Sequence, residues 1–197
     1  MSNLVFDLDG VLITYKKNFA ESYSAEFGIP TSKIYDFFAN DYYDCAVGRA
    51  ALPDKIAKYI EPWRWTGDAN SLIDYWFACQ STVDDRLVAL IGSARAAGNK
   101  CYAASDQDAM RSAYIRSLID LDSVFNDCFF SCELGVTKAE PEFFERVLDS
   151  LRSAPADVNF WDDNPKNVAT AEKSGINAEV YTSYDDFLIP FSHRFSA

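Results

Sequence analysis

Four aspartates stand in two short motifs, at spacings that suit chemistry on a charged substrate. Asp7 and Asp9 lie two residues apart directly after an apolar run, and Asp162 and Asp163 are adjacent after another. Paired carboxylates can supply a nucleophile, a general acid or base, and the oxygen ligands that Mg²⁺ prefers. The sequence therefore points to carboxylate chemistry.

Other nucleophiles and metal ligands give weaker signals. The five cysteines include no CxxC pair, so neither a disulfide framework nor a zinc site is indicated. The one histidine, His193, is expected on the surface, and a Ser-His-Asp triad would depend on it alone. The chemistry is therefore sought among the carboxylates.

The elements that must position these carboxylates alternate between strand and helix. Short apolar runs rich in β-forming residues predict strands over 3–8, 100–104, 127–131, 158–161 and 178–181. Apolar residues at helical spacing predict helices over 84–97, 109–119, 141–150 and 165–174. This alternation indicates an α/β fold, with a Rossmann-like parallel sheet and helices on both of its faces.

A long segment after the first strand interrupts the alternation. Tyr15, Phe19, Tyr23 and Phe27 recur every four residues, which predicts the apolar face of a helix. Further helical patterns cover 32–38, 51–60 and 71–81. We expect an α/β core of residues 1–14 and 86–197, and a helical insertion of residues 15–85. Two places in this insertion are candidates for contacting a substrate or for simple packing, namely Gly48-Arg49 and Trp63-Arg64-Trp65.

The polar residues that end the predicted strands should meet at one edge of the sheet, because ligands of such sheets bind beyond the carboxyl ends of the strands. These residues are Asp7, Asp9, Ser105, Asp106, Lys138, Asp162 and Asp163. Five ionised carboxylates and one lysine give a local charge of −4. Such crowding is unfavourable unless a cation is bound or a proton is shared, and carboxylate ligands favour Mg²⁺ over zinc. The edge therefore predicts a magnesium ion and an anionic ligand.

The same residues lie in motifs that resemble the four motifs of the haloacid dehalogenase-like (HAD) superfamily. The segments are FDLDGVL at 6–12, SDQ at 105–107, ELGVTKAEPEFF at 133–144 with Lys138, and FWDDNPKNVATAEKSGI at 160–176. Their order and spacing match the family, and the helical insertion resembles its C1-type cap, which closes over small substrates. The resemblance covers essentially the whole sequence outside the insertion.

The resemblance implies a role for each catalytic residue. Asp7 would be the nucleophile that forms an aspartyl-phosphate, and Asp9 would protonate the leaving oxygen and then activate water. Ser105 and Lys138 would hold the transferring phosphoryl group, with Asp106 beside them in the phosphate site. Phosphoryl transfer depends mainly on positioning and charge stabilisation, which such residues can supply.

The resemblance also implies a magnesium site. Asp7, Asp163 and the backbone carbonyl of Asp9 would bind the ion, with Asp162 in a supporting role. Three positions depart from the family pattern, since Asn is frequent in place of Asp106 and an acid in place of Thr14 and Asn167.

The activity that the resemblance implies is that of a Mg²⁺-dependent phosphatase for a small phosphorylated metabolite, such as a sugar phosphate. The acid at Asp9 favours a phosphatase, because the dehalogenases of the superfamily lack an acid there. A phosphomutase and a non-catalytic binding protein on the same fold are the alternatives.

The charge of the chain excludes some partners. With 18 Lys and Arg against 30 Asp and Glu, the formal net charge is −12 and the pI about 4.4. Nucleic acids and anionic membranes attract basic surfaces, so neither is expected as a partner. No apolar run approaches the ~20 residues that span a bilayer, and the sequence begins without a signal-peptide pattern, so a cytoplasmic protein is expected. A homodimer is left open.

Overall fold

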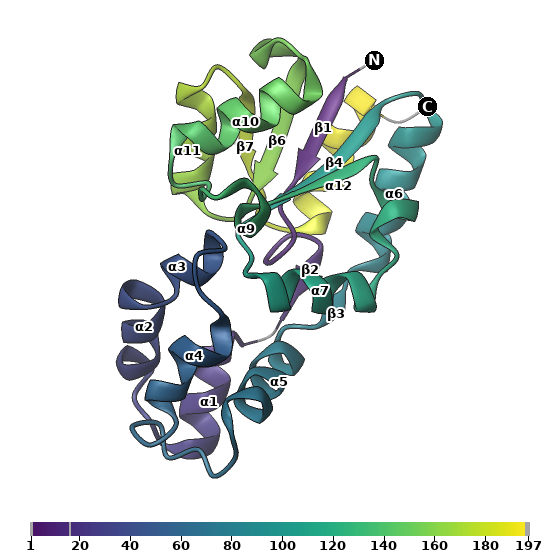
Figure 1. Cartoon of the computed structure of the whole chain (residues 1–197). Helices are drawn as coiled ribbons and strands as arrows, with labels where there is room; N and C mark the ends of the chain where they lie inside the picture. The colour runs from purple at the N-terminus through teal and green to yellow at the C-terminus, as the bar shows by residue number, and fades with distance from the viewer. Residues whose placement is uncertain (1, 16, 196–197) are drawn as a thin grey trace.

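One parallel sheet organises the chain, of which the computed structural model describes residues 2–15 and 17–195 (Figure 1). The strand order is β5-β4-β1-β6-β7, and every neighbouring pair is parallel. The strands are β1 (Asn3–Phe6), β4 (Lys100–Ser105), β5 (Asp127–Phe130), β6 (Val158–Asp162) and β7 (Asn177–Val180). The predicted α/β fold is confirmed, and the predicted strands end within two residues of the observed ones.

Helices cover both faces of the sheet. Leu4 and Phe6 of β1 pack with α6 (Asp85–Ala96) and α12 (Tyr184–Phe195) on one face. Val5 packs with α10 (Pro141–Leu151) and α11 (Pro165–Lys173) on the other. Because helices cover both faces, the strands β1, β4, β5 and β6 are mainly buried and apolar, which explains their apolar runs, whereas most of the edge strand β7 is exposed. Three further helices of this part are α7 (Ala109–Leu118), α8 (Leu121–Val124) and α9 (Ser131–Leu134).

The helical insertion forms a second hydrophobic cluster, which lies beyond the carboxyl ends of the strands (Figure 1). Phe19, Tyr23, Phe37 and Trp63 are almost completely buried in it. Tyr15 belongs to neither this cluster nor a helix, so the predicted apolar stripe begins only at Phe19. The helices are α1 (Phe19–Phe27), α2 (Thr31–Asn40), α3 (Tyr43–Ala46), α4 (Leu52–Ile56) with a 3₁₀ turn (Ala57–Tyr59), and α5 (Ala69–Cys79).

Two short strands join the insertion to the sheet. β2 (Ile13–Thr14) leads into it and β3 (Thr82–Val83) leads out, and the two pair antiparallel. At its other end the insertion packs directly on α9. Gly48 has a φ of +71°, and a Cβ there would lie 2.4 Å from the carbonyl oxygen of Cys132. Gly48 therefore serves close packing of backbone on backbone.

The insertion also hydrogen-bonds to the α/β part of the chain. Ser131 Oγ donates to the carbonyl oxygen of Ala46 over 2.6 Å, and Tyr42 Oη donates to Asp108 Oδ2 over 3.1 Å. These contacts hold the two parts together over the edge of the sheet. Among the helices of the described residues, none is both long and apolar enough to cross a bilayer.

Candidate active site

Asp7 is buried at the edge of the sheet and is held from three sides. Its Oδ1 accepts from Ser105 Oγ at 2.8 Å and from the Leu8 amide at 2.7 Å, and its Oδ2 lies 2.6 Å from Lys138 Nζ. The backbone N–H of Asp7 donates to the carbonyl of Trp161, so β6 fixes its position. The structure thus brings together three residues for which the sequence predicts catalysis.

Lys138 places a buried positive charge between two aspartates. Its Nζ lies 2.6 Å from both Asp7 Oδ2 and Asp162 Oδ2, and the residue is 1% exposed. Burial by itself would lower the pKa of Lys138, but the attraction of Asp7 and Asp162 raises it above its ordinary value. The lysine therefore keeps its charge and can neutralise a phosphoryl group.

Asp106 positions this lysine. Its Oδ1 accepts from the backbone N–H of Lys138 at 2.9 Å, which ties the loop before α10 to the end of β4. Burial raises the pKa of Asp106. Asp106 also borders the hollow of Asp7 and Lys138, and its place in a phosphate site stays a prediction; the contact that the structure shows is its support of Lys138.

The charges of the site call for a cation. Five carboxylates, those of Asp7, Asp9, Asp106, Asp162 and Asp163, accompany the two cations Lys138 and Arg111, which leaves a formal charge of −3 when all are ionised. Burial raises the pKa of Asp7 well above its ordinary value, although Lys138 opposes the shift. The main cause is desolvation, and the charge of Asp162 adds to it, so a cation beside Asp7 would stabilise its ionised form.

A metal ion fits the aspartates of this edge. Oxygens of Asp7, Asp162 and Asp163 can all lie within 4.8 Å of one another. The carboxylate of Asp162 is already occupied, because it accepts from Lys138 Nζ at 2.6 Å and from Asn167 Nδ2 at 3.0 and 3.2 Å. Asp163 is exposed toward the hollow. Asp7 is hydrogen-bonded too, but it borders the hollow together with Asp163, whereas Asp162 is completely buried behind them, so the geometry suits Asp7 and Asp163 as ligands and Asp162 as their support.

Gly10 makes room for Asp163. A Cβ at Gly10 would lie 2.2 Å from Asp163 Oδ2, and the φ of this residue is +84°, where side chains are strained. A residue with a side chain at position 10 would therefore collide with Asp163, which explains the glycine directly after Asp9.

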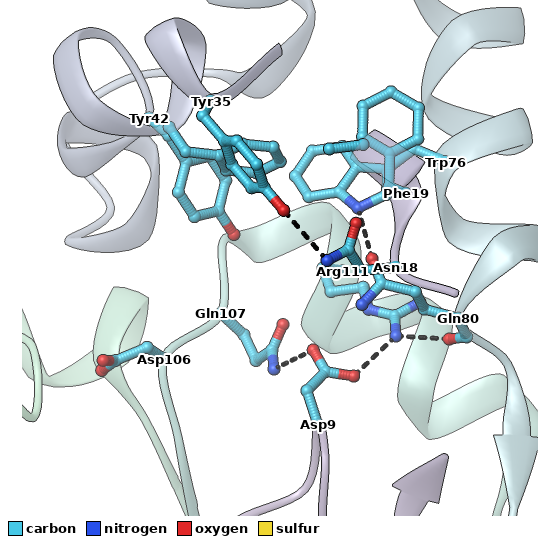
Figure 2. A pocket seen from close by; sticks show the side chains of 12 residues that line it. Asp9, Asn18, Phe19, Tyr35, Tyr42, Trp76, Gln80, Asp106, Gln107 and Arg111 are labelled. Atoms are coloured by element: carbon cyan, nitrogen blue, oxygen red, sulfur yellow. Dashed lines mark hydrogen bonds and ion pairs between the residues drawn. The ribbon is translucent and has the colours of Figure 1, made fainter. Parts of the chain in front are cut away.

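Asp9 is fixed by two residues to which the sequence assigned no role (Figure 2). Its Oδ2 accepts from Gln107 Nε2 at 3.0 Å, and its Oδ1 accepts from Arg111 Nη2 at 2.9 Å. Gln107 Nε2 also donates to Ser105 Oγ at 2.9 Å. Gln107 thus connects Asp9 to the hydroxyl of Ser105, which contacts Asp7. The place of Gln107 in the SDQ motif was the feature of the sequence that could have indicated this role.

Arg111 connects Asp9 to the helical insertion. The guanidinium, only 2% exposed, donates to the carbonyl oxygens of Phe77 and Gln80 at the end of α5. Arginine is almost never fully buried unless it is paired, and here Asp9 and the α5 carbonyls pair it. The pattern of α7 gives no sign of this burial, because the partners lie in distant segments.

Other residues that the sequence analysis considered for substrate contact or catalysis lie outside the cluster around Asp7, with the exception of Tyr15. Trp63 is buried in the core of the insertion, and His193 is exposed. All five cysteines are free, and burial raises the pKa of each, to about 12 for Cys101. Tyr15, by contrast, borders the hollow of Asp7, where burial and the nearby aspartates raise its pKa to about 12.

Two hollows meet at Asp9. One, of about 220 Å³, is bordered by Asp7, Lys138 and Asp163. The other, of about 300 Å³, lies between the insertion and the sheet edge, and five of the twelve residues that line it are aromatic (Figure 2). Asp9, Asp106 and Gln107 line both. A molecule that reacts at Asp7 can therefore extend past Asp9 into the second hollow.

Known proteins share this fold. The chain is similar over its full length to a HAD family enzyme, BT-2542 of Bacteroides thetaiotaomicron, solved in complex with magnesium and inorganic phosphate, with 20% identity, 99% of both chains covered and a TM-score of 0.81. The L-2-haloacid dehalogenase of Xanthobacter autotrophicus is more distant, with 17% identity, 100% of this chain and 89% of that chain covered, and a TM-score of 0.69. At such identities the likeness shows the fold alone.

Sequence comparison also finds curated relatives. The bifunctional epoxide hydrolase 2 of Rattus norvegicus is 31% identical over 71 residues, which are 36% of this chain and 13% of that protein. The chain thus spans only a small part of this relative. The family model of the haloacid dehalogenase-like hydrolases matches residues 1–175. Fold, motifs and family model agree, and the chain belongs to the haloacid dehalogenase-like hydrolase family.

Proposed function

We propose that this chain is a Mg²⁺-dependent phosphatase that hydrolyses a small phosphorylated metabolite, with the helical insertion as its cap. The position of Asp9 supports this most directly. Its carboxyl lies where the two hollows meet, between a phosphoryl group at Asp7 and a leaving group in the second hollow. A general acid must reach the leaving oxygen, and this place allows it.

The proposed reaction has two steps. Asp7 attacks phosphorus, the bond from phosphorus to the leaving oxygen breaks, and Asp9 gives that oxygen a proton. A water molecule then attacks the aspartyl-phosphate, Asp9 takes the proton of this water, and the bond between phosphorus and Asp7 breaks. Inorganic phosphate leaves, and both aspartates return to their starting state.

The neighbours of Asp7 serve this reaction through position and charge. Ser105 and Lys138 already contact the carboxylate of Asp7, so an attached phosphoryl group would lie within their reach. The ion would be held by Asp7, Asp163 and the backbone carbonyl of Asp9. When bound, Mg²⁺ supplies the positive charge that lets a phosphate dianion approach Asp7. The magnesium and phosphate bound by BT-2542 support the choice of metal.

The two adjacent aspartates are expected to respond differently to substitution. Asp163→Asn should raise the Mg²⁺ concentration for half-maximal activity by about 100-fold or more, because a direct ligand is lost, whereas Asp162→Asn should raise it by about 10-fold. Asp162→Asn should instead lower the melting temperature of the metal-free protein, since Lys138 loses a buried partner. Magnesium titration of activity and thermal unfolding check both. Equal magnesium dependence in the two variants would contradict these roles.

The activity itself is tested by phosphate release from a panel of phosphomonoesters, with Mg²⁺ and with excess chelator. We expect free phosphate and the dephosphorylated alcohol, formed only with Mg²⁺. A phosphomutase would return an isomer of the substrate, and a dehalogenase would release halide from 2-chloropropionate without releasing phosphate. Turnover that continues in excess chelator would overturn the metal requirement.

A further inference from the structure

The hollow between the insertion and the sheet edge is walled by five aromatic side chains. They are Phe19, Tyr35, Phe38, Tyr42 and Trp76, and its volume is about 300 Å³. We infer that this hollow binds the leaving group of the phosphoester, and that this group is a planar, apolar, uncharged one such as an aromatic alcohol. The inference rests on the proposed phosphatase function and names its substrate class.

The aromatic walls are fixed before a ligand arrives. The rings of Phe38 and Trp76 meet edge to face with centroids 5.1 Å apart, and those of Phe19 and Trp76 stack at 5.5 Å. Trp76 Nε1 donates to Gln80 Oε1 at 3.0 Å, and Tyr42 Oη is bonded to Asp108. Rings held in this way form a rigid surface on which another ring can stack or meet edge to face without further ordering.

The charged groups of the hollow disfavour a second anionic group on the substrate. Of the residues that line it, only Asp9, Asp106 and Arg111 carry charge in the described part of the chain. Arg111 is 2% exposed, and three of its N–H groups donate to Asp9 and to the carbonyl oxygens of Phe77 and Gln80, so its positive charge is already shared by groups of this chain. Both carboxylates repel such a group. A bisphosphate or a phosphorylated acid is therefore a poor fit.

The polar groups of the hollow also disfavour a sugar. Gln107 Nε2 donates to Asp9 and Ser105, Gln80 Oε1 accepts from Trp76, and Asn18 Nδ2 donates to Tyr35 Oη at 3.1 Å. These contacts already engage part of each amide, and the other walls include five aromatic rings, so some hydroxyl groups of a sugar would lie against rings without hydrogen bonds. Burying polar groups without hydrogen-bond partners costs free energy, whereas burying an apolar ring carries no such penalty.

The test compares four esters of alcohols: benzyl phosphate, ethyl phosphate, a hexose phosphate and phosphoglycolate. Benzyl and ethyl phosphate both release primary alcohols, so their difference reports binding more than bond strength. We expect kcat/KM for benzyl phosphate to exceed that for ethyl phosphate by about 10-fold or more, mainly through KM. The hexose phosphate should fall below benzyl phosphate, and phosphoglycolate should be the poorest of the four.

A pair of exposed tyrosines provides a matched control. Tyr35 lines the hollow and is 46% exposed, while Tyr43 is 40% exposed and does not line it. Both can be replaced with little risk to folding. Tyr35→Ala should lower the ratio of kcat/KM for benzyl over ethyl phosphate severalfold, and Tyr43→Ala should leave this ratio unchanged, even if the absolute rates shift.

A binding measurement separates this inference from the proposed hydrolysis. 2-Naphthylmethanol, a product-like probe, should quench the fluorescence of the tryptophans in the wild-type protein and bind more weakly to Tyr35→Ala than to Tyr43→Ala. Release of phosphate with preference for the hexose phosphate or phosphoglycolate would overturn the substrate class and leave the phosphatase standing. Binding of the probe without any phosphate release would overturn the phosphatase and leave the aromatic site standing. Absence of both would overturn both.

Discussion

Asp7→Asn is expected to abolish turnover while the protein stays folded. An amide has nearly the shape of a carboxylate but no negative charge, so phosphorus is no longer attacked, and the rate of phosphate release should fall by about 10⁴-fold or more. Folding should survive, because burial already raises the pKa of Asp7 and a neutral side chain fits this place. Lys138 retains Asp162 as its partner.

The measurements are phosphate release in a steady-state assay and the melting temperature. Asp149→Asn is the matched control, since Asp149 lies exposed near the end of α10, and this variant should match the wild type in both. Near-normal phosphate release from folded Asp7→Asn would show that another group is the nucleophile.

Lys138→Met should damage both stability and activity. Removing the ammonium leaves Asp7 and Asp162 buried side by side without their cation, and breaking a buried pair costs about 3–5 kcal/mol, which lowers the melting temperature by about 6–20 °C. Activity should fall by about 10²–10³-fold or more, because the charge of the phosphoryl group is no longer neutralised.

Two further variants test this explanation of the Lys138 effect. Lys166→Met replaces an exposed lysine at the start of α11 and should change the melting temperature by no more than about 2 °C. Lys138→Met combined with Asp162→Asn removes one of the two unpaired carboxylates, so it should regain part of the stability but none of the activity. A loss of stability no larger than that of Lys166→Met would refute the role of this buried charge.

The sequence predicts best what local patterns determine. The strands and most helices follow from apolar runs and helical spacing, and the four motifs place Asp7, Ser105 and Lys138 at one edge. The helix α12 was not expected, although Phe187, Phe191 and Phe195 recur every four residues within it and pack on the sheet. Pro190 in its middle obscures the pattern, because proline usually ends a helix.

Contacts between distant segments are what the sequence does not show. The burial of Arg111 depends on the end of α5, and the contact of Asp106 with the Lys138 amide depends on how two loops meet. Arginine and aspartate are usually exposed, so composition and spacing place both on the surface or in a motif. The shared lining of the two hollows at Asp9 likewise requires coordinates.

The short ladder of β2 and β3 makes the helical insertion an exchangeable module. Thr14 and Thr82 face each other across this ladder, so the chain enters and leaves the insertion at neighbouring points about 4.8 Å apart. A tight turn could join these strands directly, as in a hairpin, without altering any strand of the parallel sheet. Recombination at this ladder would therefore replace the aromatic hollow as a unit, and specificity could evolve independently of the aspartates that perform the chemistry.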